Sequence, residues 1–284
     1  MKVYLLFLSV LLLLVNVISL SLPGPASKFS AVPGPAAAVN ISGDAKVKAP
    51  AAEGEKDHIQ VTFKWTNIKK EEIVSLLKIP KKTLNVEVRN FGISADIKML
   101  HPRYLKKQGF KLLTGKPVVD YREVYSRNLK NFKEITADLK QSAQIKQGVD
   151  PLVDFLRFTQ QMDYRIPPKI YNGRYIREFY TPLLCLEKKM GDCDTKTILL
   201  ADLLGALESF REELGIVILK GYGIFHAILA IKRKPLPGTL KLYFRGKGYF
   251  MPLEVSGPGW NPGFVGRNTF NCLKAGLFRF GTLN

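Results

Sequence analysis

One seven-residue stretch, Gly191 to Thr197, constrains the fold more than any other part of the chain. It reads Gly-Asp-Cys-Asp-Thr-Lys-Thr and runs directly into the mostly apolar segment 198–204. Asp192 is a good helix N-cap, because its carboxylate can accept hydrogen bonds from the free backbone N–H groups of the first turn. Cys193 then falls at the first helical position, where the helix dipole favours a thiolate over a thiol. The stretch therefore predicts a buried helix that begins at a nucleophilic cysteine.

A nucleophilic cysteine needs a base and a group that orients the base, and two downstream residues are candidates for these roles. His226 lies in the apolar segment 224–231, and Glu254 lies in the segment 249–255, and both segments have strand-like patterns. Taken alone, His226 is a core histidine and Glu254 a surface charge. Their order after Cys193 favours a Cys-His-acid triad instead, provided that Glu254 lies on the side of its strand that faces His226.

Several motifs together resemble the bacterial transglutaminase-like (papain-like) superfamily. Gly-Asp-Cys-Asp heads a Leu-rich helix, His226-Ala227 follows in an apolar strand, and Leu-Glu-Val-Ser-Gly-Pro-Gly-Trp occupies 253–260. The segment 158–164 is similar to the helix-plus-tyrosine element that precedes the cysteine in that family. The segment 180–186 is similar to its Tyr-Pro…Glu-Thr-Leu approach, although Leu-Cys replaces the usual Glu-Thr. The resemblance covers roughly Lys130 to Phe270 well and the part from His58 weakly.

The resemblance implies an α+β fold with a papain-like core, in which the nucleophile helix packs on an antiparallel sheet. It implies a thiol enzyme that acts on amide bonds of proteins or peptides, by hydrolysis or by acyl transfer to an amine, and that needs no cofactor. Gln160, Tyr164 and Tyr180 are then candidates for the substrate wall or the oxyanion site, although a helical glutamine is also commonly just solvated. The alternative is a non-enzymatic envelope scaffold or binding module that keeps an idle triad.

The chain divides into four expected parts. Residues 1–26 have the apolar pattern of an export signal, or of a retained anchor over 3–22, and 27–56 have the Pro, Gly and Ala content of a flexible linker. Residues 57–128 form a strand-rich N-terminal region, and 129–284 form the transglutaminase-like catalytic domain. Within the N-terminal region we expect a strand over 58–66, a short helix over 69–77 and a further strand around 84–88.

The net charge of +19 suits an exported protein, periplasmic or secreted, that meets anionic envelope polymers or acidic proteins. A well-solvated basic surface without a specific partner explains the charge equally well. No nucleic-acid motif is present, and the histidine and cysteine spacing predicts no metal site. Of the three cysteines, Cys185 and Cys272 either pair in a disulfide or both stay free.

Overall fold

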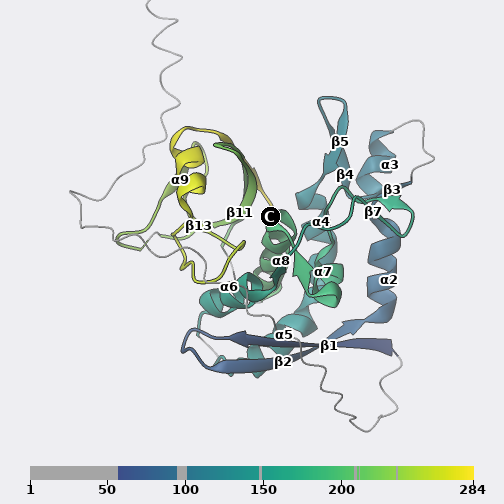
Figure 1. The fold of residues 1–284 in the computed structure, drawn as a ribbon, viewed down its shortest axis with the longest axis horizontal. Helices are drawn as coiled ribbons and strands as arrows, with labels where there is room; N and C mark the ends of the chain where they lie inside the picture. Colours follow the sequence, from purple (N-terminus) through teal and green to yellow (C-terminus); the bar gives the residue numbers. More distant parts are fainter. Residues whose placement is uncertain (1–56, 95–100, 147–148, 208–209, 211, 235) are drawn as a thin grey trace, which may run out of the picture.

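The predicted nucleophile helix is the central element of the fold (Figure 1). The computed structural model describes residues 57–94, 101–146, 149–207, 210, 212–234 and 236–284. Helix α8 (Cys193–Gly205) begins at the expected cysteine, and eleven of its thirteen residues are buried. A helix that is apolar on all sides can be stable only inside a core, so the rest of the chain encloses it.

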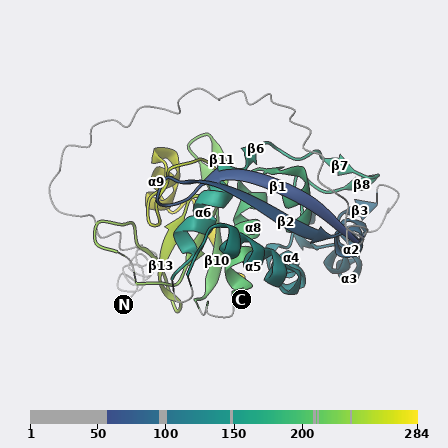
Figure 2. The same cartoon turned by 90° about the horizontal axis from the view of Figure 1, so that it is seen from below.

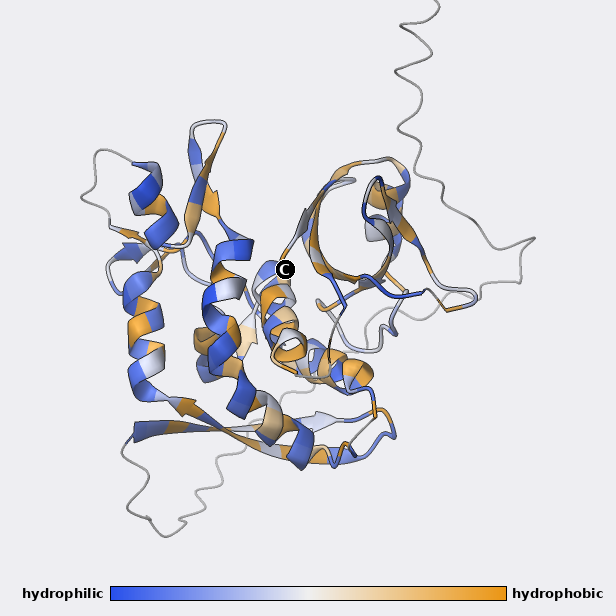
Figure 3. Ribbon diagram, turned by 180° about the vertical axis from the view of Figure 1, so that it is seen from behind, coloured by the Kyte–Doolittle hydropathy of each residue, from blue (hydrophilic) through white to orange (hydrophobic). Residues whose placement is uncertain are grey.

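An antiparallel sheet packs against α8 through its central strand. The sheet has the strand order β12-β13-β11-β10-β14 and is formed by β10 (Leu214–Gly221), β11 (Ile224–Ile231), β12 (Leu242–Phe244), β13 (Gly248–Leu253) and β14 (Phe278–Thr282). It curls into a half-barrel around helix α9 (Arg267–Lys274), as Figure 3 shows from behind. The inner face and α9 share a small core that includes Val217, Phe250 and Leu273. The expected α+β class and the antiparallel sheet are confirmed.

Helices cover α8 on the sides that the sheet leaves open. They are α4 (Tyr121–Asn128), the 3-10 helix η2 (Leu129–Asn131), α5 (Phe132–Ser142), α6 (Leu152–Gln161) and α7 (Pro182–Lys188), each of which contacts α8. The buried side chains of these helices and of α8 form one continuous core, which also takes in residues of the N-terminal hairpin. The main core therefore extends across the expected boundary at 128/129.

The N-terminal region begins with a hairpin of β1 (His58–Thr66) and β2 (Glu72–Pro80), which Figure 2 shows lying across α5 and α6. The strand predicted over 58–66 is confirmed, whereas the helix predicted over 69–77 is wrong. In β2, buried and exposed residues alternate strictly, so one face packs on α5. The strand predicted around 84–88 is also wrong, because this segment belongs to helix α2 (Lys81–Asn90).

The remaining elements are short. They are β3 (Ile93–Ser94), α3 (Pro102–Lys107), the hairpin of β4 (Phe110–Leu113) and β5 (Lys116–Val119), and the strands β6 (Asp163–Tyr164), β7 (Ile170–Tyr171), β8 (Arg174–Tyr175) and β9 (Met190–Gly191). The predicted signal and linker, 1–56, lie outside the described residues. Among the helices that are described, none combines the length and the hydrophobicity needed to cross a membrane.

Candidate active site

The start of α8 is held by a cap and by close packing. The Asp192 carboxylate accepts a hydrogen bond from the backbone N–H of Thr195 at 3.3 Å, which confirms its predicted role as the N-cap. A Cβ atom on Gly191 would lie 2.6 Å from Thr195 Cγ2 and 3.1 Å from the sulfur of Cys185, so only glycine fits there. These contacts place Cys193 in the first turn, whose N–H groups have no carbonyl partner within the helix.

His226 and Glu254 meet as the sequence predicted. The Nε2 atom of His226 lies 3.0 and 2.9 Å from the two carboxylate oxygens of Glu254, which follows directly on strand β13. The backbone N–H and the hydroxyl of Ser256 both donate to the same carboxylate, at 3.0 and 2.6 Å. Burial alone would raise the pKa of Glu254, but the hydrogen bonds from His226 and Ser256 lower it. The imidazole is therefore oriented by a buried, ionised acid.

Cys193 completes the cluster. Its thiol lies close enough to the His226 side chain to raise the pKa of the imidazole. Burial lowers the pKa of His226, but the interactions with Cys193 and Glu254 outweigh it and raise the value to about 10. The imidazole is thus held as an imidazolium at neutral pH, beside a sulfur that is only 7% exposed. This arrangement can stabilise a thiolate and can donate a proton.

Tyr164 lies near the thiol. Burial raises the pKa of Tyr164, and the nearby Cys193 raises it further. Strand β6 carries Tyr164 and pairs in parallel with β9, which ends at Gly191, just before the cap of α8. Tyr164 is half-exposed, so it lies at the surface of the molecule near the almost buried Cys193.

Gln160 is close to the triad, but it cannot donate to an oxyanion. Its amide nitrogen donates to the backbone carbonyls of Glu254 and Trp260, at 2.7 and 2.8 Å, so both N–H bonds are used. The side chain is 2% exposed, which also contradicts the alternative of a solvated glutamine. Gln160 instead joins the end of α6 to the segment that follows β13. It thereby fixes the backbone that carries the Glu254 carboxylate.

Tyr180 is near the helix start through its backbone. Its N–H donates to the hydroxyl of Thr195 at 3.3 Å, while its ring packs edge-on against the ring of Tyr171, with centroids 5.7 Å apart. The side chain is buried in this aromatic contact. Of the three predicted wall residues, Tyr164 is thus the one whose side chain lies near Cys193.

Lys196 is a site residue that the sequence reasoning missed. Its side chain is fully buried one turn after Cys193, and its Nζ donates to the carbonyls of Gln160 and Met162 at 3.1 and 3.0 Å. Burial lowers its pKa to about 8, and the charges of Glu254 and Cys193 act in the opposite direction. A lysine next to the apolar segment of a predicted buried helix was the available signal, because such a residue is almost never buried without a specific contact.

Tyr121 is the second missed residue. Its hydroxyl lies 2.6 Å from a carboxylate oxygen of Asp194, the residue after the cysteine, and so ties α4 to the start of α8. Burial, followed by the neighbouring charge of Asp194, raises the pKa of Asp192 to about 8. No local pattern points to Tyr121, because it lies 73 residues before its partner.

The three cysteines all belong to the described residues, and all three are free. Cys185 packs under Gly191, and the Cys272 sulfur lies 3.4 Å from the carbonyl oxygen of Gly221, so the two occupy different parts of the core.

Scans against protein-family models, curated proteins and solved structures each gave no match to this chain. The site geometry is therefore the main basis for a functional proposal.

Proposed function

We propose that the protein is a transglutaminase-like (papain-like) cysteine enzyme that hydrolyses amide bonds in proteins or peptides. One observation carries the proposal: His226 is hydrogen-bonded to Glu254 and lies close to Cys193, and both neighbours raise its pKa. The arrangement of a cysteine at the start of a buried helix and a histidine on the adjoining antiparallel strand supports a papain-like core. Three residues from three separate elements meet in the order that a thiol triad requires.

In the proposed reaction, the Cys193 thiolate attacks the carbonyl carbon of an amide, and the new S–C bond moves an electron pair onto the carbonyl oxygen. The backbone N–H of Cys193 and the hydroxyl of Tyr164 are the candidate donors to this oxyanion. When the C–N bond breaks, the imidazolium of His226 gives its proton to the leaving amine, while Glu254 keeps the ring oriented. Water then attacks the thioester, which releases a carboxylic acid and restores the thiol.

Two other functions share parts of this proposal. Acyl transfer to an amine, such as a lysine side chain, uses the same first half-reaction and differs only in the acceptor. A scaffold or binding module with an idle triad is favoured by a separate observation, namely that Cys193 is almost buried and lies near Tyr164. In that case the Cys193 thiol would stay inaccessible to substrates.

We also propose that the protein acts outside the cytoplasm, in the periplasm or after secretion. The proposal rests on the signal-like segment 1–26, with a retained anchor over 3–22 as the alternative. The strongly basic composition supports an anionic envelope polymer or an acidic protein as a partner.

A trapping experiment separates the three functions. The full chain is incubated with a peptidyl 4-nitrophenyl ester, with and without dansylcadaverine, and the acylated residue is located by mass spectrometry. A hydrolase gives a hydroxylamine-sensitive thioester on Cys193 and the free acid, whereas an acyltransferase gives the dansyl amide. Cys272→Ala, which removes a free thiol elsewhere, should leave the result unchanged. An intact protein that forms no adduct on Cys193 would refute the enzymatic proposal and favour the scaffold.

A further inference from the structure

A cavity of about 1290 Å³ lies between α2 and α4, outside the triad. Its lining includes residues 205–207, at the C-terminal end of α8, so the cavity and Cys193 lie at opposite ends of this helix. With a rise of 1.5 Å per residue, the thirteen-residue helix separates them by about 18 Å. The cavity is therefore a second site and not an extension of the thiol site.

The charge of the lining is strongly one-sided. It contains four lysines and one arginine, but only one acidic residue, Glu87. Lys130 and Lys133 are exposed on η2 and α5, and neither forms an ion pair within the part of the chain that the structure describes. Unpaired basic residues along one cavity favour an anionic occupant, because like charges repel and an acidic partner relieves that repulsion.

Two buried polar groups in the lining lack partners. Thr181 is 2% exposed, and its buried Oγ1 has no hydrogen-bond partner among the described residues. Glu87 accepts from the N–H of Leu183 through Oε1 at 3.3 Å, but its buried Oε2 has no partner among the described residues. Burial raises the pKa of Glu87 to about 7, against the opposing effects of Thr181 and Leu183, so this carboxyl is only about half ionised near neutral pH. Unpartnered buried polar groups in a cavity are the expected contacts of a ligand.

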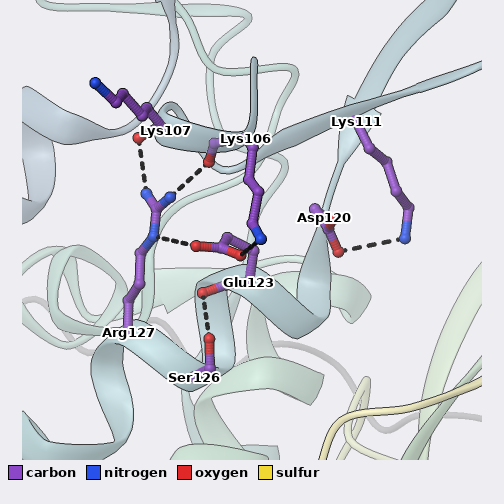
Figure 4. A network of polar contacts seen from close by, with 7 residues as sticks. All are labelled: Lys106, Lys107, Lys111, Asp120, Glu123, Ser126 and Arg127. Carbon is purple, nitrogen blue, oxygen red and sulfur yellow. Dashed lines mark hydrogen bonds and ion pairs between the residues drawn. The ribbon is translucent and has the colours of Figure 1, made fainter. Parts of the chain in front are cut away.

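A network of polar contacts joins α3 to α4 on the basic side of the cavity (Figure 4). The Arg127 guanidinium donates to Glu123 at 2.8 Å and to the carbonyls of Lys106 and Lys107 at the end of α3. This network fixes α3 against α4 and holds Lys107 at the rim. A preformed wall lowers the entropy that a ligand loses on binding.

Apolar side chains line the cavity between these polar groups, among them the exposed Val86 and the buried Phe91, Val124 and Leu207. We propose that this cavity binds an acidic polypeptide segment with interspersed apolar side chains, presented by a partner or a substrate protein. Its carboxylates meet the lysines, its apolar side chains contact Val86, and its backbone hydrogen-bonds with Glu87 and Thr181. A polypeptide supplies all three kinds of group, and the cavity exceeds the size usual for small-molecule sites.

Binding of a short fluorescein-labelled peptide that alternates Glu with Leu and Gly tests the proposal. The assay uses the full chain with Cys193→Ala, so that the thiol cannot react with the probe and the result is independent of the proposed enzymatic function. We expect binding that weakens with salt and falls about tenfold or more in the double variant Lys130→Glu/Lys133→Glu. Arg245→Glu/Arg279→Glu makes the same change in net charge on the half-barrel, at exposed positions, and should bind as the parent does.

A second variant tests the apolar contact. Val86→Asn places a polar group on an exposed position of the wall and should weaken binding about threefold without affecting the fold. The same peptide with Gln in place of Glu should not bind. The proposal is overturned if the parent does not bind the acidic peptide, if both charge-reversed variants weaken binding equally, or if the Gln peptide binds as well as the Glu peptide.

Discussion

Loss of His226 should change how the reactivity of Cys193 depends on pH. An isolated thiol with the reference pKa of about 8.5 is about 0.3% thiolate at pH 6 and about 76% thiolate at pH 9. Its alkylation rate therefore rises about 240-fold between these two values. In the intact protein His226 has a pKa of about 10 and remains an imidazolium across this whole range. A thiolate paired with it should react at nearly the same rate at pH 6 and pH 9.

The assay is the rate of Cys193 alkylation by iodoacetamide in the intact protein and in His226→Ala. Taking the ratio of the rates at pH 9 and pH 6 for each protein removes the change in access that the smaller alanine causes. We expect a ratio near unity in the intact protein and of about 100 or more in the variant. His58→Ala, which removes a histidine from β1, is the matched control and should behave as the intact protein does.

Two outcomes would contradict this reasoning. A steep rise in the intact protein would show that Cys193 is an ordinary thiol and that the imidazolium does not stabilise its charge. Equal ratios in the intact protein and in His226→Ala would show that the charge is stabilised by another group, such as the helix dipole.

Three further predictions concern the triad and its neighbours. Tyr164→Phe removes the hydroxyl that lies near Cys193 and should raise the alkylation rate at pH 7 about fivefold, as measured with iodoacetamide. Glu254→Gln should lower the His226 pKa towards about 6.5, which an NMR titration can detect. It should also lower the unfolding free energy by about 3–5 kcal/mol, as measured by urea unfolding at pH 7. An unchanged titration of His226 would exclude the ion pair. Lys196 has a lower pKa when folded, about 8, than when unfolded, so its contribution to stability rises as pH increases from 8 to about 10.5. The unfolding free energy of Lys196→Met minus that of the parent should therefore fall by about 3 kcal/mol between pH 7 and pH 11, because only the parent gains stability in this range. A difference that stays constant would contradict the lowered pKa of Lys196.

The core of the site was predictable because its signals are local. Asp192 and Cys193 are adjacent at a helix start. A nucleophilic cysteine needs a base and an acid that orients the base, and the chain offers both further along. His226 and Glu254 both lie in or next to strongly apolar strands, where a charged residue stands out. Patterns of this kind can be recognised in a single sequence, since they do not depend on contacts between distant parts of the chain.

The errors have two physical causes. In the segments 69–77 and 84–88, apolar residues recur both at every second position and at spacings of three or four, so periodicity does not distinguish a strand from a helix. The role of Gln160 depends on carbonyl groups 94 and 100 residues away in the chain. These two carbonyl groups accept hydrogen bonds from both N–H groups of the Gln160 side chain. The sequence around Gln160 indicates only that the residue lies on a helix.

The order of the triad along the chain affects how the thiol behaves during synthesis. Cys193 emerges from the ribosome before His226 and Glu254, and the strands that carry these two residues form only when the half-barrel closes. A nascent chain that ends after α8 has the cysteine but neither the base nor the acid. Because the contacts are non-local, they form late in folding. The incomplete chain therefore lacks the pairing with His226 on which the proposed reactivity of Cys193 depends.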